Sequence, residues 1–539
     1  MDADEPLSSA IAAVIEIGRA WPVSPEARVG PHPDAYRTVG IVGGGTAGYL
    51  TALALRRHRP ELEVTLIESS AIPVIGVGEA TTPEIVRMLH SPHFLGRDIL
   101  DFYRRVEPTW KLGIKFQFGP RDFTFPFQRG RLLESKLYDG HLNNQSLAAM
   151  LMATDRGPVI RDEEGRVTSL AHLVRWAYHL ENRRFVRYLA EEAAAAGVTH
   201  VDAKIAEVRK TPDGEGVAEL VTDDGRRLSF DLYVDCSGFR SLLLEGALGS
   251  PYRDWSSTLF TDRAITASVP HDGTVKPYTL AETMDAGWCW NIPFESEDHR
   301  GYVFSSNALS ADQAEAEMRA KNPRMGPASL VRFRSGRHEH VWKGNVVAIG
   351  NAYGFVEPLE STAIHMVVLT LENLTTHFPA SRHDRGVPES LNRKVGQRWD
   401  ALRWFLGAHY RFNRRLDTPF WRAANAEANI DGALERVALF RERAPLSYRT
   451  SLFYTLIPPE FFSDDHSFDT ILMGLDVAAR YVDPVEAPRT WSRHRATMLR
   501  ATSGAMPQAE ALRWLRENPE ALAKLASDRA GWIHRSIPA

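Results

Sequence analysis

Cysteine is scarce in this sequence, and neither sign of charge prevails. Its 539 residues include two cysteines, Cys236 and Cys289, which cannot form a disulfide framework and fit a reducing cytoplasm. The 64 Lys and Arg residues nearly balance the 68 Asp and Glu residues, so the net charge is -4. A protein that binds duplex nucleic acid normally carries a basic excess or a basic stripe. The charge balance therefore argues against nucleic acid as a partner.

Long hydrophobic runs and internal repeats are absent as well. No uncharged stretch reaches the roughly eighteen residues that a membrane helix requires. Residues 1–5 are acidic, whereas a secretory signal peptide begins with a basic segment. We therefore expect a cytoplasmic protein with no membrane partner.

The residues that are present have the composition of an ordinary globular protein, with 44% hydrophobic and 24% charged residues. Their periodicity divides the chain into an N-terminal extension (1–36), an α/β core (37–368) and a helical C-terminal part (369–539). Strand, helix and strand at 37–42, 47–58 and 63–68 indicate a βαβ unit, whose crossover makes the strands parallel. Further strands are predicted at 200–208, 216–222, 231–235 and 345–349, and a further helix at 182–196.

A glycine loop separates the first strand from its helix. Residues 43–48 read Gly-Gly-Gly-Thr-Ala-Gly and fit G-x-G-x-x-G. In this motif the first glycine permits a tight turn, the second admits a pyrophosphate, and the third lets the helix approach the sheet. The helix start offers free N–H groups to the phosphates, and an acid about 20 residues on can bind a ribose hydroxyl. The residues expected to hold the dinucleotide are Gly43, Gly45, Thr46, Ala47, Gly48 and Glu68.

Two further elements favour FAD over NAD as the dinucleotide. A second glycine-rich loop, 75–81, follows the second strand, and the late strand 345–349 leads into a Gly-Asn pair. A late strand-to-loop element is where FAD oxidoreductases contact the ribityl chain, and a simple NAD enzyme needs neither element. Ordinary strand ends with turns would also explain each of them. The additional FAD-binding candidates are Ile75, Glu79, Ala80, Asn351 and Ile364.

Four segments together resemble the flavin-dependent halogenases, specifically the tryptophan halogenase group. They are residues 43–48, 76–81 (GVGEAT), 287–293 (GWCWNIP, with the W-x-W-x-I-P signature) and 355–362 (FVEPLEST). The resemblance covers residues from about 37 to 421. It implies an α/β fold in which a flavoprotein monooxygenase-like FAD core carries inserted substrate-side segments and precedes a mostly helical substrate-side part.

The resemblance also implies the activity. Such an enzyme uses reduced FAD, O2 and chloride or bromide to form hypohalous acid, which reaches a lysine and halogenates an aromatic C–H, commonly in antibiotic biosynthesis or other secondary metabolism. The lysine matches at Lys111 and the catalytic glutamate at Glu360. The halide would lie near the amides of Thr362 and Ala363, where the family usually has glycine at the second position. We expect no metal.

Partners and substrate follow from the same resemblance. No second nucleotide fingerprint is evident, so a separate flavin reductase should supply reduced FAD, and the sequence leaves open whether the protein forms a homodimer. Trp288 and Trp290 would separate flavin from substrate. Phe125 stands where the family has histidine, and Phe453 replaces the first tyrosine of a clamp that Tyr454 and Glu460 continue. We expect an indole substrate, as tryptophan or a tryptophan-like moiety, either free or within a larger molecule or peptide, with free tryptophan a poor substrate.

Other functions remain open from the sequence. An FAD-dependent aromatic monooxygenase would share the fold but would not need Lys111, Glu360 and both tryptophans together. A flavin-binding protein without halogenating activity would result if Ala363 spoils the halide site, because alanine disfavours positive φ. Individually, Lys111 fits an ordinary surface lysine, Glu360 a helix N-terminal acid and Phe125 core packing.

Overall fold

The computed structural model describes residues 32–72, 78–161, 164–271, 273–449 and 465–526. The predicted extension up to residue 31 lies outside the described residues, as do four candidate or comparison positions in the site. These four are Ile75, Phe453, Tyr454 and Glu460. The boundaries at 36/37 and 368/369 stay predictions.

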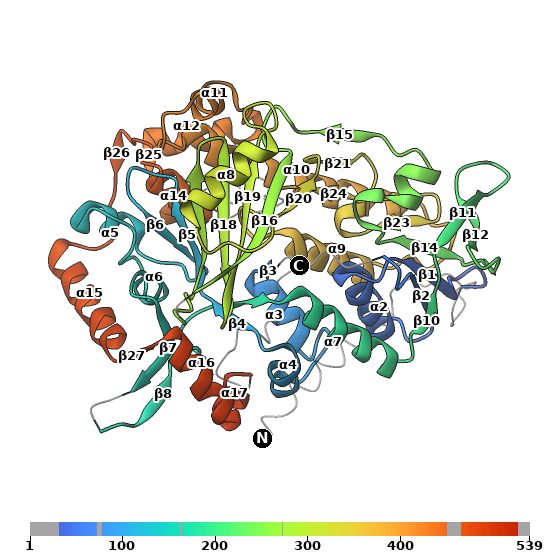
Figure 1. Cartoon of the computed structure of the whole chain (residues 1–539), viewed down its shortest axis with the longest axis horizontal. Coiled ribbons are helices and arrows are strands. Elements are labelled where there is room, and N and C mark those ends of the chain that lie inside the picture. Colours follow the sequence, from blue (N-terminus) through green and yellow to red (C-terminus); the bar gives the residue numbers. More distant parts are fainter. Residues whose placement is uncertain (1–31, 73–77, 162–163, 272, 450–464, 527–539) are drawn as a thin grey trace, which may run out of the picture.

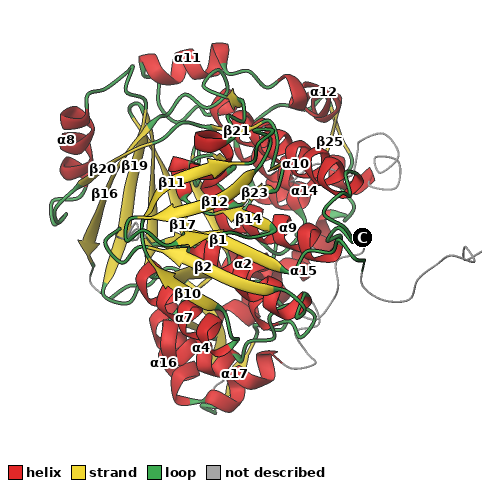
Figure 2. Cartoon of the chain, turned by 90° about the vertical axis from the view of Figure 1, so that its right-hand side faces the viewer, coloured by secondary structure: helices red, strands yellow, loops and turns green. Residues whose placement is uncertain are grey.

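A six-stranded sheet forms around the predicted βαβ unit, which is confirmed. Its strand order is β10-β2-β1-β14-β23-β22, and all neighbours are parallel except the edge pair β22–β23. The apolar residues of β1 and β2 are almost fully buried, as in parallel sheets covered on both faces. Helix α2 packs on β2 and contacts α7 and α9 (Figure 2). The bounds are β1 Thr38–Val42, α2 Thr46–His58, β2 Glu63–Glu68, α7 Asn182–Ala195, β10 Thr199–Asp202, β14 Leu232–Asp235, β22 Trp342–Lys343, β23 Val346–Ala348 and α9 Ala363–Thr376.

A seven-stranded sheet, in the order β20-β16-β19-β18-β17-β5-β6, stands beside the first (Figure 1). Its neighbours are antiparallel except β5 and β17, which are parallel. Helix α8 packs on its β16 and β19 strands. The bounds are β5 Gly113–Gln117, β6 Phe123–Pro126, β16 Arg263–Pro270, β17 Thr279–Met284, β18 Gly287–Pro293, β19 Glu297–Phe304, α8 Ala311–Lys321 and β20 Ser329–Arg332.

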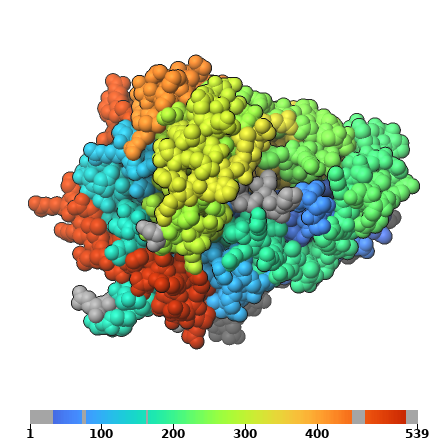
Figure 3. Space-filling model, viewed as in Figure 1, coloured from blue at the N-terminus to red at the C-terminus, as the bar shows by residue number. Residues whose placement is uncertain are grey.

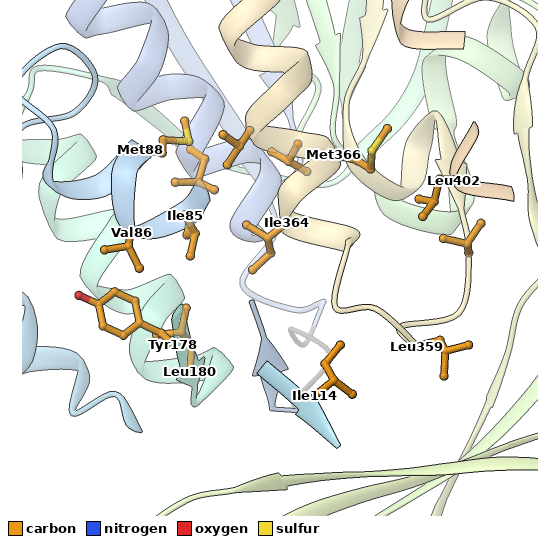
Figure 4. Packing of buried hydrophobic residues seen from close by; sticks show 14 of the residues in the cluster. Ile85, Val86, Met88, Ile114, Tyr178, Leu180, Leu359, Ile364, Met366 and Leu402 are labelled. Atoms are coloured by element: carbon orange, nitrogen blue, oxygen red, sulfur yellow. The ribbon is translucent and has the colours of Figure 1, made fainter. Parts of the chain in front are cut away.

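A separate small sheet, in the order β3-β9-β4, holds the predicted site residues Glu79, Ala80 and Lys111. Strand β9 (Ala177–Leu180) pairs antiparallel with both β3 (Glu79–Ala80) and β4 (Thr109–Lys111). The segment that follows β3 forms helix α3 (Pro83–His90), which packs on α9. Figure 4 shows Ile85 of α3 and Ile364 of α9 on these neighbouring helices, with Leu359 in the loop that leads into α9.

The chain after α9 is mostly helical, as predicted, and its long helix α10 spans Gly386–Phe412. The C-terminal segment returns to residues near 160, because β27 (Ala505–Pro507) pairs with β7 (Arg156–Arg161). Figure 3 shows this red segment against the teal one. None of the helices in the described residues is both long and apolar enough to cross a membrane.

The remaining elements complete the periphery. The helices are α4 Ile99–Val106, α5 Leu132–Asp139, α6 Leu147–Ala153, α11 Pro419–Glu427, α12 Leu434–Glu442, α14 Asp465–Gly474, α15 Pro488–Ser503, α16 Gln508–Glu517 and α17 Pro519–Ala526. The strands are β7 Arg156–Arg161, β8 Val167–Ser169, β11 Ile205–Lys210, β12 Val217–Thr222, β13 Arg227–Leu228, β15 Tyr252–Asp254, β21 Gly336–His338, β24 Gly354–Phe355, β25 Arg443–Ala444, β26 Tyr481–Val482 and β27 Ala505–Pro507.

One strand prediction is wrong. The run at 200–208 forms two strands, β10 and β11, which belong to different sheets. The chain leaves the six-stranded sheet where the amide of Ala203 donates to the carbonyl of Glu68, and the amide of Lys204 then donates to Asp223. The bond to Glu68 is the last of the β10–β2 ladder, and the bond to Asp223 begins the next pairing; the break falls at Asp202, Ala203 and Lys204, which are poor strand formers.

Candidate active site

A cavity of about 580 Å³ lies beside the glycine loop, and we call it the nucleotide cavity. Its walls come from both large sheets, from β3 and from the start of α9. Most of the residues predicted to bind FAD line it, although they are scattered along the chain. They are Gly43, Gly45, Thr46, Ala47, Glu68, Glu79, Ala80, Asn351 and Ile364.

The three motif glycines meet different surroundings. Gly43 has φ +118°, and a side chain there would collide with the carbonyl of Cys236. A side chain at Gly48 would collide with the carbonyl of Gly43, so this residue sets the approach of α2 to the sheet. Gly45 alone faces open space, because a Cβ placed there meets nothing within 4 Å. The open cradle above Gly45 is the shape that a pyrophosphate requires.

The polar groups around this cradle fit FAD. The start of α2 carries no side-chain cap, so its first amides can donate to phosphate oxygens. One carboxylate oxygen of Glu68, Oε1, accepts from the Tyr49 hydroxyl at 2.5 Å and the His200 Nε2 at 2.9 Å. These donors hold the carboxylate beside the loop, where it can accept a ribose hydroxyl. Burial raises the pKa of Glu79, in the cavity wall, to about 7, so this carboxyl can also donate a hydrogen bond near neutral pH.

Gly45→Val is expected to raise the Kd for FAD at least tenfold, about 1.4 kcal/mol. The valine would extend into open space and not into protein atoms, so the apoprotein should keep its Tm. Fluorescence titration with FAD and thermal unfolding measure the two quantities, and Gly45→Ala should show a smaller loss of affinity. Unchanged affinity in the valine variant would disprove the cradle assignment.

Lys111, at the end of β4, is fully buried, contrary to the surface alternative. Its amine donates to the carbonyl of Thr81 at 3.0 Å and to the hydroxyl of Ser361 at 2.5 Å. Thr81 is itself bonded through both its amide and its hydroxyl to the carbonyl of Tyr178 on β9, the strand with which β4 pairs. The ring of Phe127 lies 5.3 Å from the amine. The lysine is therefore held from two sides in an aromatic, water-poor setting.

The protonation of Lys111 follows from this setting. Burial lowers the pKa of its amine to about 7, and the nearby carboxylate of Glu360 opposes that change only in part. An amine with a pKa near neutrality can give up or take a proton during a reaction at physiological pH.

Glu360 lies in the loop before α9 and is 5% exposed. Its Oε1 is 2.8 Å from Nε2 of His409, near the end of α10. Burial raises the pKa of the carboxyl, while His409 and Lys111 counteract that change. The two residues that the resemblance singled out, Lys111 and Glu360, are thus brought close enough for their charges to interact.

Ser361 connects this pair to the nucleotide cavity. It lines the cavity and also accepts the hydrogen bond from Lys111. Its φ is +58°, a left-handed conformation that costs a non-glycine residue about 1 kcal/mol. The positive φ thus falls on Ser361, whereas Ala363 begins α9 without one, so the expected conformational penalty at Ala363 is wrong.

The predicted halide residues stand at the start of α9. Ala363 is the first residue of this 14-residue helix and lines the nucleotide cavity. The hydroxyl of Thr362 is buried and, among the described residues, has no hydrogen-bond partner. Free amides, a positive helix end and an unused hydroxyl together suit a small anion.

The predicted substrate residues are only partly assembled. Trp288 and Trp290 lie on one face of β18, with ring centroids 6.0 Å apart. Trp290 lines the nucleotide cavity, whereas Trp288 is not among its lining residues. Phe125 is partly buried and pairs with Ile114 across β5 and β6.

Sequence reasoning missed His409 and Phe127. A histidine within a long amphipathic helix carries no sequence signal of its role, because its partner Glu360 is 49 positions away. Phe127 ends the run Phe-Thr-Phe-Pro-Phe at 123–127, and alternation along that run separates it from neither Phe123 nor Phe125.

Known proteins resemble this chain over most of its length. A tryptophan halogenase family model matches residues 38–489. Tryptophan 7-halogenase RebH of Lentzea aerocolonigenes is 32% identical over 494 residues, covering 85% of this chain and 92% of RebH. The solved structure of MibH, a lathipeptide tryptophan 5-halogenase, is 48% identical with a TM-score of 0.89, covering 94% of this chain and 99% of MibH. BrvH, a flavin-dependent halogenase from Brevundimonas sp. BAL3, is 31% identical with a TM-score of 0.78, covering 89% and 99%. The chain therefore belongs to the tryptophan halogenase family and is a flavin-dependent halogenase.

Proposed function

We propose that this enzyme uses reduced FAD, O2 and chloride or bromide to halogenate the indole ring of a tryptophan carried in a peptide. The observation that carries the halogenation step is the burial of Lys111 against Ser361, on the wall of the nucleotide cavity and within electrostatic reach of Glu360. The likeness to MibH, a lathipeptide tryptophan 5-halogenase, supports the peptide-borne tryptophan.

The oxidant would form in the nucleotide cavity. FAD held there and reduced by a separate flavin reductase would supply the electrons with which O2 and the halide yield hypohalous acid. The glycine loop and Glu68 hold the dinucleotide. The amides at the start of α9 and the hydroxyl of Thr362 hold the halide by hydrogen bonds and by the positive helix end.

Lys111 and Glu360 act on the substrate side. The Lys111 amine hydrogen-bonds the oxygen of hypohalous acid, which orients the halogen toward the indole. The ring carbon forms a bond to the halogen as the oxygen–halogen bond breaks, and the leaving hydroxide takes a proton from the Lys111 ammonium to become water. Glu360 then accepts the proton from the substituted carbon and restores the aromatic ring. Because Ser361 separates the cavity from the amine, Lys111 never needs to touch the cofactor.

The surroundings of Lys111 favour a substrate without free charges. Phe127, which is only partly buried, borders the amine. Burying an ammonium or carboxylate without full partners costs several kcal/mol, whereas aromatic walls favour an apolar ring. The clamp residues Tyr454 and Glu460 lie outside the described residues, so their part in holding an amino acid stays a prediction.

We expect kcat/KM for a tryptophan-containing peptide to exceed that for free tryptophan at least tenfold, about 1.4 kcal/mol of transition-state binding. Mass spectrometry of reactions with FAD, a flavin reductase, NADH and chloride or bromide gives the rates. The N-acetyl amide of tryptophan is the matched control, because it removes both charges without adding a peptide. If kcat/KM for the N-acetyl amide equals that for the peptide, the preference is due to the missing charges alone.

Two outcomes would contradict the proposal. A tenfold advantage for free tryptophan would make the departures at Phe125 and Phe453 incidental. An oxygenated product that forms equally well without halide would indicate an aromatic monooxygenase.

A further inference from the structure

His409 is a fully buried histidine whose two ring nitrogens both have partners. Its Nδ1 is 2.9 Å from the carbonyl of Phe405, one turn earlier in α10, and its Nε2 is 2.8 Å from Oε1 of Glu360. Aromatic rings of Phe116, Phe118 and Phe405 surround the imidazole. The ring is therefore fixed in both position and orientation.

These contacts fix the number of protons that the pair holds. A backbone carbonyl can only accept, so Nδ1 of His409 carries a hydrogen. Neutral imidazole opposite an ionised carboxylate would leave two acceptors facing each other at Nε2 and Oε1. One proton must therefore lie between these atoms, either on the imidazole, giving an imidazolium and a carboxylate, or on Glu360. His409 thereby occupies Oε1, and among the described residues Oε2 makes no hydrogen bond.

The next residue of α10 holds the other end of the same loop. The hydroxyl of Tyr410 donates to Glu357 at 2.7 Å, and Thr261 donates to the same carboxyl oxygen. Successive residues of one helix thus anchor Glu357 and Glu360, three residues apart in the turn that leads to Ser361. The position of the turn is set by α10 and not by the turn alone.

The charged groups around the pair are few. Lys111 of β4 faces Glu360, and Glu357 of the same loop faces His409. Burial raises the pKa of Glu357 as well as that of Glu360, and the His409 hydrogen bond is the largest effect that lowers the latter. Without His409, Glu360 would hold its proton to higher pH.

We propose that His409 is a positioning residue for halogenation, which binds Oε1 of Glu360, keeps the carboxylate ionised between turnovers and leaves Oε2 to take the ring proton. This inference rests on the proposed function. The proton that Oε2 accepts balances the one that the Lys111 ammonium gives to the departing hydroxide, so the net reaction joins the halogen to the ring and releases water. Proton return from Glu360 to the Lys111 amine resets both groups.

The test compares His409→Leu, His409→Gln and the neighbouring control Tyr410→Phe. In His409→Leu we expect kcat to fall at least tenfold, with KM and the trapped yield of hypohalous acid within twofold of wild type. The acidic limb of the kcat–pH profile should move to higher pH, because the carboxyl has lost the group that keeps it ionised. Glutamine still offers a donor to Oε1, so His409→Gln should recover most of kcat. Tyr410→Phe, which loosens Glu357, should lower Tm and leave the acidic limb in place.

Other results would overturn the inference. A His409→Leu enzyme with wild-type kcat and an unmoved acidic limb would do so. Equal increases in KM and equal decreases in hypohalous acid yield in all three variants would do so as well. Nuclear magnetic resonance of protein labelled with ¹⁵N-histidine tests it without turnover. The His409 signals should show a proton on Nδ1 and should change in Glu360→Gln, and unchanged signals would count against the pair. A wild-type enzyme that halogenates nothing would refute the proposed function, while this spectrum would still decide the His409–Glu360 contact.

Discussion

Lys111→Met should lower kcat for halogenation about a thousandfold and leave the Kd for FAD within twofold. A positioned hydrogen-bond donor and proton source commonly accounts for a factor of 10² to 10⁴ in rate. Methionine fills the space of the lysine stem but can neither orient hypohalous acid nor protonate the leaving hydroxide. Flavin affinity should persist because Lys111 does not line the nucleotide cavity, whereas its partner Ser361 does. Single-turnover halogenation assays and FAD titration provide the two numbers.

Lys115→Met is the matched control for that result. Lys115 lies four residues on, in β5, where its amine is partly exposed and 3.9 Å from Asp122. The Lys115→Met enzyme should keep the wild-type kcat. Near wild-type halogenation in Lys111→Met would show that another group orients the oxidant and would remove Lys111 from the mechanism.

Lys111→Met should also change how the free energy of unfolding depends on pH. The pKa of Lys111 is about 7 in the folded protein and 10.5 as the ordinary value. Between these values the unfolded chain holds a proton that the folded protein lacks, so the unfolding free energy of the wild type rises with pH. Each pH unit in this window adds up to about 1.4 kcal/mol. From pH 7 to pH 10 the wild type should therefore gain about 4 kcal/mol relative to Lys111→Met.

Urea unfolding of the wild type and of Lys111→Met at several pH values measures the difference in their unfolding free energies. Titrations that occur equally in both proteins cancel in this difference. Lys115→Met should track the wild type across the same range. A constant difference between Lys111→Met and wild type from pH 7 to pH 10 would mean that the buried amine stays charged throughout.

The sequence predicts most of the residues that surround the nucleotide cavity, because their signal is local. A strand, a glycine turn, a helix start and an acid follow one another within thirty-odd residues, and each obeys backbone geometry that any residue series of this kind must satisfy. The single strand predicted at 200–208 is wrong although a local signal was present. Asp202, Ala203 and Lys204 are poor strand formers, and there the chain passes from the ladder with β2 to a bond with Asp223.

The catalytic half is assembled from distant positions. Lys111 takes its partners from 30 and 250 residues away, and nothing in its own segment distinguishes it from Lys115. Family resemblance identified Lys111 and Glu360, whereas elementary chemistry alone favoured a surface lysine and a helix-start acid. His409 has neither a motif nor a neighbour in sequence that would indicate its role. Such residues emerge only when packing brings α10 against the loop before α9.

The two-residue strand β3 connects the nucleotide cavity to the site at Lys111. Glu79 and Ala80 line the nucleotide cavity, and the next residue, Thr81, supplies the carbonyl to which the Lys111 amine is bonded. A ligand that displaced this strand would displace the carbonyl to which the amine is bonded, so the cavity wall and the lysine are one residue step apart. Thermodynamic linkage requires the effect to be mutual: if the cofactor tightens the grip on the substrate, the substrate must tighten the grip on the cofactor by the same factor. By this linkage a bound substrate would help to retain the reduced flavin until the halogenation step.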